Sequence, residues 1–157
     1  MAGKKTLTFD DGIVEYDING KATARFNPTD TAFIERMWNA ISDLENEQSQ
    51  LQAEVDEIGE IEDDLERGER MIAYLKERDA DMRKTIDDLV GEGVADALFN
   101  DMNCYAIADG VPVWINFMFM IADEIYDNLS KSESQAKPRL DSYSDKYTAL
   151  VNKYKKR

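Results

Sequence analysis

The sequence predicts a mainly α (α+β) fold, a long helical hairpin or bundle that follows an antiparallel β-meander at the amino terminus. The first observation is a run of apolar residues at alternating three- and four-residue steps, which is typical of one face of a long amphipathic or coiled-coil helix. The second is the Asn19-Gly20 pair between two β-prone segments, which favours a tight hairpin. The apolar run consists of Ile34, Met37, Ile41, Leu44, Leu51, Val55 and Ile58, with Gln48 at its one gap.

Residues 1–26 are predicted to form the β-meander. Strands are expected at residues 6–9, 13–18 and 21–26, with Asp-Asp-Gly at 10–12 as the first turn. Alternation along the second strand puts its apolar side chains on one face. A unit this small is marginal in water, so we expect that face to pack on the helices.

Residues 27–130 are predicted to form a helical body. Thr29 or Asn27 is expected to cap the first helix, which should run from about residue 29 to the high 50s. The apolar spacing slips at Ile58, near Gly59 and Gly68. Either one long helix continues through the slip, or the chain turns back as an αα-hairpin, which we favour. The second helix of this hairpin, ~61–90, would then carry Leu65, Ile72, Leu75, Met82, Ile86 and Leu89 on one face.

A short helix at 94–99 and an irregular connector at 100–110 are expected next. The most apolar helix follows, from residue 113 to about 129, and is predicted to be central and buried. Ser130–Lys137 is read as a polar linker. Residues 131–157 are predicted to form a basic tail, whose short amphipathic helix carries Leu140, Tyr143, Tyr147, Leu150 and Tyr154.

Charge is distributed unevenly along the chain. The net charge is −14, yet residues 131–157 hold eight Lys or Arg against three acids, so the remainder carries −19. Residues 43–66 contain eleven acids and no Lys or Arg. This balance argues against direct nucleic-acid binding, which depends on basic side chains. The tail is expected either to fold back on the acidic body or to contact an acidic neighbour head to tail.

The longest nearly apolar run, Val111–Ala122, is about twelve residues, short of the ~20 that span a bilayer, so no membrane association is expected. A lone Cys104 suits a reducing cytoplasm. The chain has no histidine, and no phosphate-binding or nucleophile motif is present, so we predict neither an enzyme nor a cofactor or metal site. The carboxylates of the second hairpin helix, ~61–90, are interpreted as a solvated acidic face. They are Asp79, Asp81, Asp87 and Asp88.

Partner-binding candidates are therefore sought among apolar side chains. The Met- and Phe-rich run around Trp114 is either core or a protein-binding groove, because Met-rich surfaces adapt to varied apolar partners. The apolar run between residues 34 and 58 is either internal packing or a subunit or partner interface. The candidate residues are Ile34, Trp38, Ile41, Leu44, Trp114, Phe117 and Met118.

Three strings carry a resemblance to a known class of protein: FNPTDTAFIERMWNAISDLE (26–45), RDADMRKTIDDLVGEGVADALFNDMNCYAIADG (78–110) and VPVWINFMFMIADEI (111–125). They resemble small tail assembly chaperones of siphophages and prophages of Gram-positive bacteria, over most of residues 13–147. The resemblance implies a non-catalytic protein of the host bacterial cytoplasm, which coats the helical tape measure protein until the tail tube polymerises around it. Such proteins often have a short form and a longer frameshifted form, and self-association is expected.

Two other functions compete with this expectation. The first is an acidic decoy that mimics DNA and blocks a host defence enzyme, which the −19 body favours. The second is a structural tail component, in which the long helical seam builds a ring. Salt-sensitive binding to a DNA-binding enzyme would favour the decoy, and detection in purified virions would favour the structural component.

Overall fold

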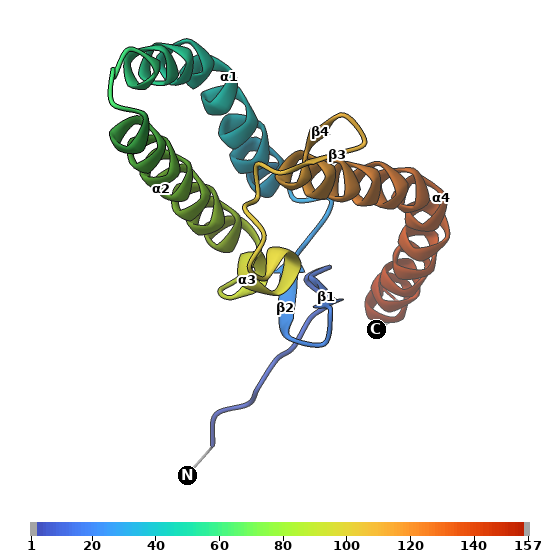
Figure 1. The fold of residues 1–157 in the computed structure, drawn as a ribbon. Coiled ribbons are helices and arrows are strands. Elements are labelled where there is room, and N and C mark those ends of the chain that lie inside the picture. The colour runs from blue at the N-terminus through green and yellow to red at the C-terminus, as the bar shows by residue number, and fades with distance from the viewer. Residues whose placement is uncertain (1–2, 156–157) are drawn as a thin grey trace.

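The computed structural model describes the backbone of residues 3–155 and, within that range, the side chains apart from those of residues 44, 45, 48, 133, 154 and 155. The fold is mainly helical with a small β part, as predicted. The α1–α2 hairpin projects from a central junction, α4 leaves it in another direction, and α3 and the β1–β2 hairpin lie beside it (Figure 1). The elements are β1 (Val14–Ile18), β2 (Ala22–Phe26), α1 (Thr31–Gly59), α2 (Asp64–Val90), α3 (Val94–Phe99), β3 (Ile107–Ala108), β4 (Val111–Pro112) and α4 (Val113–Lys155).

The β1–β2 hairpin forms where Asn19-Gly20 predicted it. Both residues have positive φ, 54° and 70°, as a type I′ turn requires. The predicted first strand, residues 6–9, is wrong, because these residues pair with no strand in the described chain. Leu7 and Phe9 are 91% and 85% exposed. Asp10 and Asp11 bind the backbone N–H groups two residues on, a local alternative to a strand ladder.

Helix α1 begins at Thr31, one residue later than a cap at Thr29 would place it. Asp30 is the N-cap, and its carboxylate accepts a hydrogen bond from the Ala32 N–H at 3.0 Å. Asn27 instead accepts bonds from the N–H and hydroxyl of Thr29, which shape the turn before the helix. The assignment of the cap to Thr29 or Asn27 was therefore wrong, since the turn uses both residues before the helix starts.

The chain turns back between α1 and α2, so the predicted αα-hairpin is confirmed. Asp63 caps α2 by accepting from the Glu66 N–H, and the Arg67 guanidinium donates to the Ile61 carbonyl at 2.9 Å. Gly59 ends α1, whereas Gly68 lies inside α2. The slip in apolar spacing therefore marks the end of a helix.

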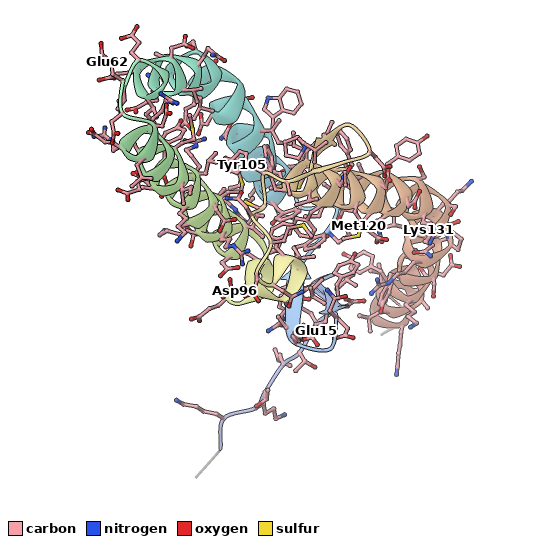
Figure 2. All side chains as sticks on the ribbon, viewed as in Figure 1. Glu15, Glu62, Asp96, Tyr105, Met120 and Lys131 are labelled. Carbon is pink, nitrogen blue, oxygen red and sulfur yellow. The ribbon has the colours of Figure 1, made fainter. Side chains whose placement is uncertain are left out.

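Helix α4 is longer than predicted. It continues through Ser130–Lys137, so the polar linker does not exist, and Pro138 lies inside the helix. The helix bends near Lys131 (Figure 2). Ser132 and Ser134 donate to backbone carbonyls of the preceding turn, and such bonds, like a proline, bend helices. We call residues 113–130 the first limb and residues 131–155 the second limb.

One core joins the β-hairpin to the helices. Phe26 stacks on Phe33 with ring centroids 4.6 Å apart, and on Tyr16 at 4.8 Å. The Tyr16 hydroxyl donates to Glu124 on the first limb at 3.0 Å. The predicted division at residue 26 is therefore a boundary between elements that share a core, and the division at 130 falls inside a helix.

Close backbone packing at the end of α2 requires glycine. Gly91 has φ +137°, and a Cβ built there would lie 3.1 Å from the carbonyl oxygen of Thr23 in β2. Beyond it, the Asp87 carboxylate accepts bonds from the N–H groups of Gly93 and Ala95 at 3.1 and 2.9 Å. This cap holds the short helix α3 against the end of α2.

Candidate helix-binding surfaces

The most apolar of the predicted binding residues lie in the core. Trp114, Phe117 and Met118 are 5%, 6% and 2% exposed. Their side chains pack among residues of the β-hairpin, α2 and α3, so they present no surface to a partner in this fold. The expectation that they contact a partner is corrected, because α4 turns this side of its first limb toward the junction.

The exposed side of the first limb is also apolar. Phe119, Met120, Tyr126 and Leu129 are 56%, 49%, 72% and 44% exposed. The sequence could not assign these side chains to the outside, since apolar residues surround the first three turns of this helix. With 3.6 residues per turn, Phe119, Tyr126 and Leu129 lie on one face of the helix, whereas Met120 lies to one side of it. An exposed apolar face of this kind is typical of a protein-interaction site. In Figure 2, Met120 lies on α4 between the junction and the bend.

The predicted residues of α1 separate by exposure. Ile34 and Ile41 are half-buried, and Ile41 packs against the core. Trp38 is 68% exposed and is the one member of this group that offers a large free surface. Leu44 lies outside the described side chains. The run between residues 34 and 58 is therefore mainly internal packing, since Met37 and Ile58 are buried.

A groove separates α1 from α2 along the hairpin. One part has a volume of about 440 Å³ and is lined by Met82, Leu89 and, from the connector, Tyr105. The adjoining part, about 280 Å³, is lined by Leu51 and Tyr74. Acidic side chains line both parts, namely Asp43, Glu47, Glu54, Glu77, Asp81 and Asp88.

Arg78 stands between the two parts of the groove. Its guanidinium lies 3.5 Å from Glu47, donates to the Tyr105 hydroxyl at 3.2 Å and lies 5.7 Å from the centroid of the Tyr105 ring. Figure 2 shows Tyr105 at the base of the hairpin, beside the start of α4. Arg78 Nε and the Tyr74 hydroxyl are buried without a hydrogen-bond partner among the described residues.

A polar network holds the connector against α2. Asp79 accepts bonds from the Cys104 N–H at 2.8 Å and from Arg83 Nε at 2.9 Å. Arg83 also donates to the carbonyls of Asn100 and Met102. Burial by itself raises the pKa of Asp79, but the bonds from Cys104 and the charge of Arg83 outweigh it and hold that pKa below its ordinary value. Asp79 is therefore structural, which corrects its assignment to a solvated face.

Cys104 is buried beside Asp79. Burial, with the neighbouring Asp79, raises the pKa of the Cys104 thiol to about 12, and the side chain is 0% exposed. A thiol in this state is a weak nucleophile at neutral pH. The described part of the chain contains no cluster of three or more metal-ligating side chains. The sequence-based expectation of a non-enzymatic protein is not tested by this geometry and stays a prediction.

Comparison with known proteins leaves the resemblance untested. No family model, curated protein or solved structure matches the chain. Within the residues that the structure describes, no helix has the length and apolarity required to cross a membrane.

Proposed function

We propose that the chain is a tail assembly chaperone of a phage or prophage, and that it binds the tape measure protein through an apolar helical face. The observation that carries this proposal is the exposed apolar face of the first limb of α4, formed by Phe119, Tyr126 and Leu129. An amphipathic helix that covers such a face buries its own apolar side chains, and burial of this kind drives association. A long helical client offers the matching surface.

The surroundings of this face suit a client that is released later. The first limb carries Asp123, Glu124 and Asp127 beside its apolar residues. The apolar surface keeps a client soluble, and the charges limit uncontrolled aggregation. Binding is therefore expected to be reversible, as a chaperone that yields its client to tube subunits requires.

Co-expression with the tape measure protein from the same gene neighbourhood tests the proposal. The native chain is expected to raise the soluble fraction of the client and to co-purify with it. The double variant Phe119→Ser, Tyr126→Ser should fold, because both side chains are exposed, but lose both effects. The control is Phe9→Ser, which removes an exposed phenylalanine from the amino-terminal segment, away from α4.

Two outcomes would overturn the proposal. In the first, the client stays insoluble and unbound with the native chain. In the second, the double variant protects the client as well as the native chain does. Capture of a host DNA-binding enzyme, lost at high salt, would instead favour the acidic decoy, which the run of eleven acids in residues 43–66 makes the second candidate.

A further inference from the structure

The second limb of α4 carries an apolar stripe that nothing covers in the described chain. Leu140, Tyr143, Tyr147 and Leu150 follow one another at steps of three, four and three residues, the spacing of a coiled-coil seam. Their side chains are 69%, 57%, 70% and 52% exposed. A helix with this pattern is stable in water mainly when a partner covers the stripe.

Basic side chains border the stripe. Lys146 Nζ lies 4.9 Å from the centroid of the Tyr143 ring, and the Arg139 guanidinium lies 6.0 Å from it. Residues 131–157 carry a net charge of +5. The surface that fits this limb is therefore apolar at its centre and acidic at its edges.

The groove between α1 and α2 has this character. Its lining combines the apolar Leu51 and Tyr74 with four acidic side chains and one basic side chain, Arg78. The acidic side chains are Glu47, Glu54, Glu77 and Asp81. From Asn39 to Glu54 the groove follows about 22 Å of α1, whereas the stripe from Leu140 to Leu150 is about 15 Å long, so the groove can hold the stripe.

The limb does not reach this groove within one molecule. In Figure 1 the carboxyl end of α4 lies on the opposite side of the junction from the far end of the α1–α2 hairpin. Among the described side chains, no ion pair joins residues 131–153 to the rest of the chain. Pairing of two second limbs with each other would bring two positively charged segments together, which is unfavourable.

We propose that the second limb of α4 of one copy binds in the α1–α2 groove of a second copy. Each molecule in such a contact keeps one free groove and one free limb. The contact is therefore heterologous, and it builds a ring where the rotation closes and a filament where it does not. The first limb stays exposed in this arrangement, so this assembly does not depend on the proposed client binding.

Light scattering on the full-length chain tests the contact. The native mass is expected to rise with concentration above the 17.9 kDa of one chain at low salt, and to return toward it at high salt. The limb variant Lys146→Glu, Tyr147→Ser and the groove variant Glu54→Lys, Asp81→Lys should each raise the concentration needed for assembly by about tenfold or more. Glu92→Lys reverses an exposed charge outside the groove and should assemble as the native chain does.

Mixing the two variants gives the sharpest result. The limb variant keeps an intact groove and the groove variant keeps an intact limb, so an equimolar mixture should form a 1:1 dimer and nothing larger. Circular dichroism of each variant establishes that it is folded. A native chain that stays monomeric at every concentration would overturn the proposal. So would a groove variant that assembles normally, because that result places the contact between two second limbs.

Discussion

Replacing Asp79 by alanine is expected to destabilise the protein by about 3 kcal/mol. The carboxylate is 20% exposed and accepts charge-assisted bonds from the Cys104 N–H and from Arg83, whose side chain is 16% exposed. Bonds to a charged group contribute about 1.5–3 kcal/mol each. We expect less than their sum, because Arg83 keeps Asp96 and two backbone carbonyls as acceptors.

Thermal unfolding followed by circular dichroism at pH 7 measures the effect. For a chain of this length, the loss corresponds to a fall in Tm of roughly 6–12 °C. Asp88→Ala is the matched control. Asp88 accepts from Lys84, and Asp79 accepts from Arg83, and in both pairs the partners are four residues apart on α2 and 2.9 Å from each other. The Lys84–Asp88 pair is exposed, and its removal should leave Tm unchanged.

The pH dependence gives a second test of Asp79. Because the folded state lowers the pKa of this carboxyl, its contribution is complete above the unfolded value of about 3.9 and is lost as the pH falls through the lower folded value. The Tm difference between the native chain and Asp79→Ala should therefore stay constant from pH 7 to 5 and shrink below pH 4. Equal effects of Asp79→Ala and Asp88→Ala at pH 7 would refute the reasoning.

Three further predictions follow from burial and backbone geometry. Trp114→Ala should lower the free energy of unfolding in urea by about 3–5 kcal/mol, because it empties a core site. Phe119→Ala, on the exposed side of the same helix, should change stability little. Similar losses for both would contradict the assigned orientation of α4. Cys104 should resist an aromatic disulfide reagent at pH 8 and react at once in denaturant, and rapid labelling of the folded chain would show that the thiol is accessible. Gly91→Ala should cost about 1–3 kcal/mol, measured in the same urea assay, because its φ of +137° strains any other residue and the added Cβ approaches Thr23; a neutral substitution would show that this backbone can relax.

Local patterns predicted most elements because their causes are local. Asn19-Gly20 specifies its turn through the positive φ values that few other residues accept. Val94–Phe99 lies where glycines on one side and Asn100 on the other predicted a short helix. Asp109-Gly110 is a hairpin signal of the same kind, and it accounts for the β3–β4 pair that we did not predict.

The errors arose where the local sequence allowed two interpretations. Residues 6–9 are β-prone, but no neighbouring edge in the described chain pairs with them. Residues 130–137 are polar and precede Pro138, yet helix formation continues through them. Polarity does not prevent a helix, and a proline bends one without necessarily ending it.

The sequence by itself determined the helical class, the hairpin at Asn19-Gly20 and the opposite charges of the body and the tail, since each depends on residues that are close in the chain. It favoured the turn after Gly59 over a continuous helix without deciding between them. Only the tertiary structure decided which apolar side chains are available to a partner. Trp114 and Phe119 are both large and aromatic, lie five residues apart on α4, and differ from 5% to 56% in exposure. That difference depends on which side of the helix meets the β-hairpin, α2 and α3, and those contacts join residues far apart in the sequence.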